Sequence, residues 1–218
     1  MHGSGTLCQA LRTVALAALL PAAFGAAAQD LPDAPDANAV RVQRAADPPR
    51  TFDDALARWK DVDDIAAFAG SAFTYDRARA LSLAESGPAA HAGQRAAIHA
   101  PDAFFAKPHG VCVDLARFGV ETLNRIQPTL QSRYLMLEFE PVVVEGATLR
   151  RHWLAAVQRE GQWWFFADSR RAGHVAGPYD SVDAFIADYA RYRERRIVAW
   201  RVTDSYLRRM RANARRAG

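Results

Sequence analysis

The spacing of apolar residues along this chain changes once, close to Pro128, and this change limits the possible fold more than any other feature. Before it, Leu115, Phe118, Thr122 and Ile126 recur along one side of a helix. After it, segments rich in aromatic and β-branched residues are typical of strands. We expect strands at residues 134–144, 152–158, 162–168 and 197–202. Helices followed by a mostly antiparallel sheet indicate an α+β domain.

Other helices are expected around this core. Thr51 can cap a helix that starts at Phe52, with Asp54 three positions after the cap. Asp180-Ser181 precedes a second well-marked helical segment at residues 182–193. Two shorter helices are predicted at residues 63–71 and 89–98.

The first 28 residues have the pattern of a secretory signal peptide. Arg12 precedes an apolar stretch at residues 13–24, and small residues at 25–28 predict cleavage before Gln29. The apolar stretch is too short for a spanning helix, and no later stretch reaches that length. An uncleaved N-terminal anchor is the alternative interpretation. We therefore expect an exported protein, periplasmic or secreted, with no integral membrane segment after signal removal.

Composition divides the remainder into three parts. Residues 29–50 are rich in Ala, Pro and Asp and are predicted to be a flexible leader. Residues 51–203 are long enough for one domain with its own core. Residues 204–218 form a basic C-terminal helix or tail. Ten of the chain's 28 lysines and arginines fall within residues 191–218. This predicts at most weak contact with anionic surfaces, or a solvated helix end, and no nucleic-acid motif accompanies the basic charge.

The cysteines are the most informative residues for function. The sequence holds two, and Cys8 would be removed with the signal peptide, so Cys112 would be alone in the exported chain. Exported proteins normally pair their cysteines because their compartment is oxidising. An unpaired thiol there is buried and inert, bonded to another chain, or reactive for a purpose.

The predicted position of Cys112 favours reactivity. It falls in the first turn of the helix that follows Gly110, where the helix dipole lowers a thiol's pKa. Free backbone N–H groups in that turn can hold an oxyanion, with Tyr75 as a candidate second donor. A small cysteine packed as an apolar residue remains the alternative.

A predicted hairpin supplies a histidine and a carboxylate. The strands at 152–158 and 162–168 flank Arg159-Glu160-Gly161, and a three-residue loop ending in Gly places His152 opposite Asp168. A two-residue Glu160-Gly161 turn would instead place His152 opposite Ser169. We predict the first register, in which the carboxylate orients the imidazole.

These residues resemble a known family. Gly110-Val-Cys112-Val-Asp114 resembles the cysteine motif of transglutaminase-like proteins, where Gly-x-Cys-x-Asp/Glu opens a helix. His152-Trp-Leu-Ala-Ala-Val and Gly161-Gln-Trp-Trp-Phe-Phe-Ala-Asp168 resemble the family's histidine strand and aspartate segment. The likeness covers about residues 70–203. It implies a papain-like fold and a catalytic triad of Cys112, His152 and Asp168.

The most similar subgroup is the bacterial transglutaminase-like cysteine peptidases. The resemblance implies a thiol hydrolase, either a peptidase or an amidase, that acts on a peptide or protein through a thioester. A transglutaminase-type acyl transferase and a non-catalytic binding module of the cell envelope are the alternatives. Calcium-dependent members carry Gly-Asp-Cys-Glu-Asp, whereas Val111 and Val113 replace two of those acids here. We predict no cofactor and no metal.

Three other polar residues lie in or near the motifs. His109 and His174 are alternative bases, although neither is predicted to face a carboxylate across a strand pair. A metal site formed by His109 and Cys112 lacks a second pair of ligands at zinc spacing. Asp114 is expected to act as an acid at the helix N-terminus rather than in catalysis.

Overall fold

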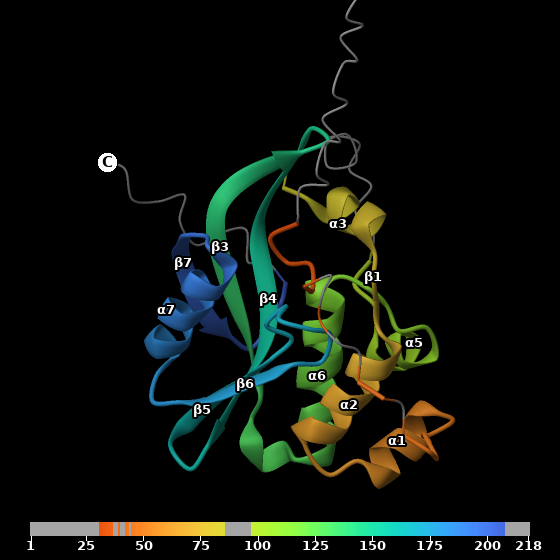
Figure 1. The fold of residues 1–218 in the computed structure, drawn as a ribbon. Coiled ribbons are helices and arrows are strands. Elements are labelled where there is room, and N and C mark those ends of the chain that lie inside the picture. Colours follow the sequence, from red (N-terminus) through yellow and green to blue (C-terminus); the bar gives the residue numbers. More distant parts are fainter. Residues whose placement is uncertain (1–30, 37–38, 40–41, 44, 86–96, 208–218) are drawn as a thin grey trace, which may run out of the picture.

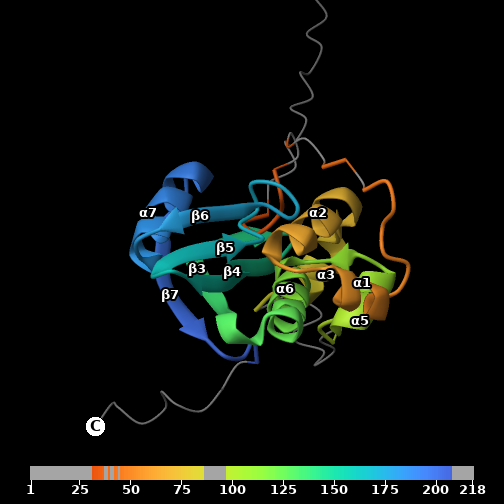
Figure 2. The same ribbon diagram turned by 90° about the horizontal axis from the view of Figure 1, so that it is seen from below.

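The computed structural model describes residues 31–36, 39, 42–43, 45–85 and 97–207. The expected signal peptide, most of the helix predicted at 89–98 and most of the basic tail lie outside these residues. Within them the chain forms an α+β arrangement in which a five-stranded antiparallel sheet lies between two helical layers (Figures 1 and 2). None of the helices in these ranges is long and apolar enough to cross a membrane.

The helices lie mostly in the first half of the chain. They are α1 (Phe52–Arg58), α2 (Val62–Ala72), α3 (Arg77–Leu83), α5 (Pro101–Ala106), α6 (Cys112–Ile126) and α7 (Val182–Arg193), with a 3-10 turn η1 (Pro128–Leu130) after α6. The strands are β1 (Thr74–Tyr75), β2 (His109–Gly110), β3 (Arg133–Val144), β4 (Ala147–Arg159), β5 (Gln162–Phe166), β6 (Val175–Tyr179) and β7 (Ile197–Thr203).

The main sheet has the strand order β6-β5-β4-β3-β7. Its two hairpin turns are Glu145-Gly146 and Glu160-Gly161, and all four residues have positive φ, as type I′ turns require. The second turn pairs Arg159 with Gln162. The three-residue loop predicted for this hairpin is therefore wrong, and the alternative two-residue turn is the one that forms.

One face of the sheet packs against the nucleophile-bearing helix α6. Phe118 and Leu123 of α6 are almost fully buried and belong to one cluster with Ala155 of β4 and Phe166 of β5. The Cβ of an alanine at Gly119 would lie 2.6 Å from the Phe166 ring, so this glycine allows helix and strand to approach closely. This packing fixes the N-terminus of α6 beside β4.

The opposite face of the sheet packs against α7. Phe185 and Tyr189 of this helix are fully buried against Leu137, Leu154 and Phe165 of the strands. The two helical layers are seen end-on in Figure 2, with α7 on one side and α6, α2, α1 and α5 on the other. The Tyr189 ring from this layer also reaches the candidate site.

The best-marked predicted elements are confirmed. The structure has α6 and α7 at their predicted positions, and the cap of α1 forms, with Thr51 Oγ1 accepting from Asp54 N at 3.1 Å. Strand β5 ends at Phe166 rather than at residue 168. Elements α3, α5 and β6 were not predicted, because their segments are too short to show a period.

Candidate active site

Cys112 is the first residue of α6, as the sequence predicted. The preceding residue, Val111, has no side chain that can cap the helix, and Asp114 takes over this role by accepting from the Val111 N–H at 3.0 Å. Arg79 holds the same carboxylate through two hydrogen bonds of 2.7 and 2.9 Å. Asp114 is therefore a buried capping acid, which confirms the structural role expected for it.

This capping explains the glycine of the cysteine motif. A Cβ at Gly110 would lie 2.7 Å from Asp114 Oδ2 and 3.0 Å from Asp114 Cβ, closer than real Cβ contacts. Gly110 therefore makes room for the carboxylate that caps the helix carrying Cys112. The Gly-x-Cys-x-Asp spacing thus has a structural reason in this chain.

Cys112, His152 and Asp33 form a buried cluster. One ligand atom from each, the thiol sulfur, a ring nitrogen and a carboxylate oxygen, lies within 4.8 Å of the other two. Cys112 is 7% exposed and His152 is fully buried. The predicted cysteine and histidine are therefore brought together, and a carboxylate that was not predicted joins them.

Asp33 comes from the stretch expected to be a flexible leader. Both Leu31 and Asp33 are buried, so residues 31–36 differ from that expectation. The Asp33 carboxylate accepts from the Tyr75 hydroxyl at 2.7 Å and lies within 4.8 Å of the Cys112 sulfur. Nothing in the local sequence distinguishes Asp33 from its neighbouring aspartates. Only the tertiary contact identifies it.

Ser169 sets the orientation of the His152 ring. Its hydroxyl donates to the Asp33 carbonyl at 3.0 Å and lies 3.2 Å from His152 Nε2. Because the hydroxyl's only proton is used, the serine can bond the ring only as an acceptor, which assigns the ring proton to Nε2. Nδ1 then keeps its lone pair, and no hydrogen-bond partner lies within bonding distance and angle of it among the described residues.

The imidazole is neutral in this environment. Burial lowers the pKa of His152 to about 3, and the guanidinium of Arg193 acts in the same direction. A backbone hydrogen bond involving Ala167 works against them. The ring also stacks on Tyr189, with centroids 5.8 Å apart. A neutral ring can accept a proton at its unprotonated nitrogen.

The structure does not place Asp168 as the partner of His152. The Asp168 carboxylate is fully buried, and Oδ1 lies 2.8 Å from Nδ1 of His174. Its other oxygen lies 3.4 Å from the Arg170 guanidinium. The predicted His152–Asp168 pairing is therefore wrong, because the two-residue turn shifts the hairpin register by one position and brings Ser169 to the ring instead.

The two alternative histidines have other partners. His109 lies 3.3 Å from the Asp76 carboxylate, and His174 forms the pair with Asp168. Neither belongs to the cluster around Cys112. His152 is therefore the histidine at the thiol.

Burial raises the pKa of the Cys112 thiol well above its ordinary value, and the charge and hydrogen bond of Asp33 add to the increase. The backbone N–H of Trp153 opposes this by hydrogen-bonding the sulfur. Burial likewise raises the pKa of Asp33. The cluster as it stands therefore holds a protonated thiol beside a neutral imidazole.

A cavity of about 300 Å³ reaches this cluster from one side. Its walls are mainly apolar, and Asp33 and Cys112 lie among them. The principal apolar lining residues are Ala80, Leu83, Ile98, Val113, Leu149 and Trp153. Arg150 and Arg151 supply charge at the wall and pair with Glu85. A cavity of this size and lining admits a short apolar side chain next to the sulfur.

The donor set of the cluster is also one that a zinc-type cation accepts, since thiolate, imidazole and carboxylate all bind zinc. The same three groups can instead perform nucleophilic chemistry with no metal.

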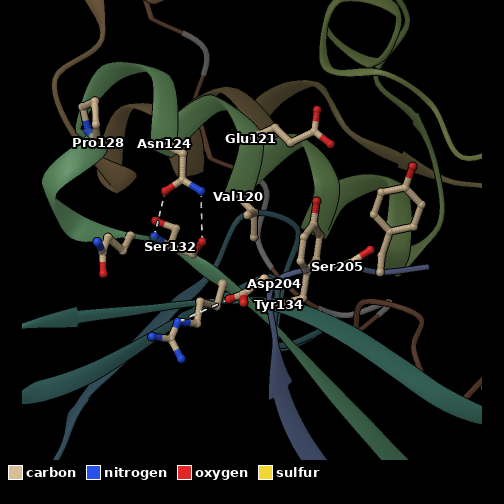
Figure 3. A pocket seen from close by; sticks show the side chains of 11 residues that line it. Val120, Glu121, Asn124, Pro128, Ser132, Tyr134, Asp204 and Ser205 are labelled. Carbon is tan, nitrogen blue, oxygen red and sulfur yellow. Dashed lines mark hydrogen bonds and ion pairs between the residues drawn. The ribbon is translucent and has the colours of Figure 1, made fainter. Parts of the chain in front are cut away.

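A second, larger cavity of about 700 Å³ lies between α6 and the end of β7 (Figure 3). Some of its polar groups are paired with one another. The Asn124 side chain makes two hydrogen bonds to the Ser132 backbone, at 2.7 and 3.0 Å, and Arg133 pairs with Asp204. No cysteine or histidine is among its lining residues. The candidate active site is therefore the cluster around Cys112.

Comparisons with known proteins add no relative. No family model, no curated protein and no solved structure matches this chain. The functional argument therefore rests on the geometry of this cluster and on the motifs in the sequence.

Proposed function

We propose that this protein is an exported thiol hydrolase, a cysteine peptidase or amidase, with Cys112 as nucleophile and His152 as base. The observation that carries the proposal is the meeting of two groups at one point: a thiol at the N-terminus of a 15-residue helix and a buried imidazole. Thiol nucleophiles are activated by an adjacent base and by a helix N-terminus.

The proposed chemistry begins with a proton transfer. His152 Nδ1 takes the proton of the Cys112 thiol, and the thiolate attacks the carbonyl carbon of an amide or ester. The C–N or C–O bond breaks as the imidazolium returns the proton to the leaving group, and a thioester remains. Water then adds to the thioester, the C–S bond breaks, and the acid and the free thiol are released.

Two groups at the site suit the developing oxyanion. The backbone N–H of Cys112 is in the first turn of α6, where N–H groups lack intrahelical partners. The hydroxyl of Tyr75 points to the same place, where it now donates to the Asp33 carboxylate at 2.7 Å. These two donors would stabilise negative charge on a substrate oxygen.

The papain-like, transglutaminase-like core is part of this proposal. It is supported by the order of Cys112 and His152 in the chain and by the packing of the cysteine helix on the antiparallel sheet. Export to the periplasm or beyond rests on the signal-like pattern of residues 1–28. A peptide or protein substrate fits the narrow apolar cavity beside the sulfur.

A second candidate is a non-catalytic module that binds a peptide. It is favoured by the buried thiol, whose pKa burial raises, and by the absence of a carboxylate on the His152 ring within the described residues. A transglutaminase-type acyl transferase differs from the hydrolase only in the resolving nucleophile, an amine in place of water.

Three assays separate these functions: hydrolysis of a p-nitrophenyl ester, release of fluorescent peptides from labelled casein, and incorporation of dansylcadaverine into casein. We expect release to exceed incorporation, and we expect Cys112→Ala and His152→Gln to abolish both. Incorporation exceeding release would identify the acyl transferase. Activity that survives Cys112→Ala, or no activity in the wild type and in Asp33→Asn, would overturn the enzymatic proposal.

A further inference from the structure

Residues 31–36 lie across the cluster around Cys112, and we call them the N-terminal plug. Leu31 is 2% exposed and packs in an apolar cluster with Ala80, Val111 and Leu149, which also line the cavity that reaches the sulfur. The Leu31 side chain therefore packs against residues that also form the walls of that cavity. In Figure 1 this segment runs between β4 and the helices α3 and α6.

The main chain of the plug is held much as a bound peptide would be. Arg193 donates to the carbonyls of Leu31 and Ala34, at 3.1 and 3.3 Å. On the other side, Ser169 Oγ donates to the Asp33 carbonyl at 3.0 Å, and Asp36 N donates to the Ser169 carbonyl at 2.9 Å. Contacts to backbone groups, combined with a pocket for one side chain, are the usual means of binding an extended peptide.

The Asp33 side chain occupies the position that a substrate needs. One carboxylate oxygen accepts from the Tyr75 hydroxyl at 2.7 Å, and the carboxylate lies within 4.8 Å of the Cys112 sulfur. A substrate carbonyl has to approach the same sulfur, with its oxygen near a donor such as Tyr75. The plug and a substrate therefore cannot occupy the site together.

The plug also keeps the thiol unreactive. Asp33 places negative charge and a hydrogen-bond acceptor at the sulfur, and both disfavour the thiolate. The two effects would disappear if Asp33 moved away, and His152 would remain beside the thiol to take its proton.

We propose that residues 31–36 are an intramolecular pseudosubstrate, a segment that occupies the peptide groove and must leave it before a substrate can reach Cys112. The inference rests on the proposed function and adds its regulation and its ligand class: an extended peptide with a leucine-sized side chain two residues before the group at the sulfur. Cleavage before Gln29, as expected from the sequence, would leave the plug attached to the exported chain.

The test measures the rate at which iodoacetamide labels Cys112 in the full chain. We expect Leu31→Ala and Asp33→Asn each to label about tenfold faster than the wild type, since each removes buried contacts that hold the plug. Asp47→Ala is the matched control, because this exposed acid pairs only with Arg58 in the described residues. It should label at the wild-type rate.

A synthetic peptide with the sequence of residues 29–36 tests the groove directly. Added to the Leu31→Ala protein, it should slow labelling again, whereas the same peptide with alanine in place of Leu31 and Asp33 should not. Wild-type labelling rates in both plug variants, with circular dichroism showing them folded, would overturn the proposal. No protection by the peptide would overturn the assignment of the groove.

The labelling result and the hydrolysis result can fail separately. Plug variants that label quickly but hydrolyse no ester or casein would leave the pseudosubstrate standing and remove the enzymatic function. Hydrolysis by the wild type, together with slow labelling in folded plug variants, would leave the enzymatic function standing and remove the pseudosubstrate.

Discussion

The sulfur of Cys112 lies within 4.8 Å of a carboxylate oxygen of Asp33, a residue outside the predicted domain. This one contact joins the N-terminal stretch to the candidate nucleophile. Tyr75 donates to the same carboxylate at 2.7 Å, so Asp33 is held at the candidate nucleophile by a hydrogen bond. The active-site proposal uses the Tyr75 hydroxyl as an oxyanion donor, and the pseudosubstrate proposal has Asp33 occupy that donor.

Asp168 should act on stability rather than on Cys112. Asp168→Asn removes the charge that pairs with His174 and Arg170, and breaking such a buried pair costs about 3 kcal/mol of unfolding free energy. His174→Gln should lower the unfolding free energy by less. In the double variant the two losses should not add, because both substitutions remove the same pair. Urea unfolding measures these losses.

The labelling rate of Cys112 in a folded Asp168→Asn protein should stay at the wild-type value. A large loss of hydrolysis in this variant without a loss of stability would instead restore Asp168 to the triad predicted from the sequence.

Calcium should have no effect on this protein. Val111 and Val113 stand where the calcium-dependent motif of the resembled family has acids, and they are 2% and 9% exposed in an apolar cluster. The remaining acid, Asp114, already accepts from Arg79, from His99 N at 2.8 Å and from Val111 N. We expect the same Tm and the same hydrolysis rate in EGTA as in calcium. A rise of Tm with calcium would contradict this.

The helix that carries the nucleophile was predictable, whereas its acidic partner was not. The apolar spacing after Cys112 and the stop at Pro128 predict α6 correctly, because these signals are local. Asp33 lies in a stretch of low complexity, and its role arises only from a contact between segments far apart in the chain. A periodicity argument contains no information about such a contact.

The hairpin register shows a different limit. Arg159-Glu160-Gly161 is compatible with a two-residue or a three-residue loop, and the two differ by one position. The structure places Glu160 at φ 51°, a conformation that disfavours residues with a side chain. A glutamate at this position therefore argued against the two-residue turn that forms. The other hairpin has the same Glu-Gly pair, at Glu145-Gly146, which is a signal that a comparison within the chain could have used.

Gly110 should tolerate no side chain while Asp114 caps the helix. Gly110→Ala places a methyl group 2.7 Å from Asp114 Oδ2, and the carboxylate cannot move away because Arg79 holds it. Overpacking of this kind costs about 2 kcal/mol of unfolding free energy. In an Asp114→Ala background the same substitution should cost almost nothing. An equal cost in both backgrounds, measured by urea unfolding, would show that the contact is not the cause.

His152 should make the folded state less stable in mild acid. Its pKa is about 3 in the folded protein against an ordinary value of 6.5, so between these values only the unfolded chain binds the proton. Stability contributed by this group is present above pH 6.5 and is lost as the pH falls toward 3, by up to about 1.4 kcal/mol per pH unit.

Asp33 works in the opposite direction, because burial raises its folded pKa. The comparison is therefore made between the wild type and His152→Gln, by urea unfolding at several pH values. The wild type should lose more stability than the variant on going from neutral to acidic pH. Parallel curves for the two proteins would mean that His152 is not buried as a neutral ring.

Ser169 should act as a positioning residue for His152. Its oxygen accepts from Nε2 at 3.2 Å and so favours the tautomer that leaves Nδ1 free for the thiol proton. Ser169→Ala removes this preference in the protein with the plug in place, where the Asp33 carbonyl holds the serine proton. Nitrogen-15 NMR of the imidazole should show a loss of the Nε2–H form. Ser71→Ala is the matched control, since that hydroxyl bonds only the Phe68 carbonyl, at 3.0 Å, in the described residues. An unchanged tautomer in Ser169→Ala would show that another group orients the ring.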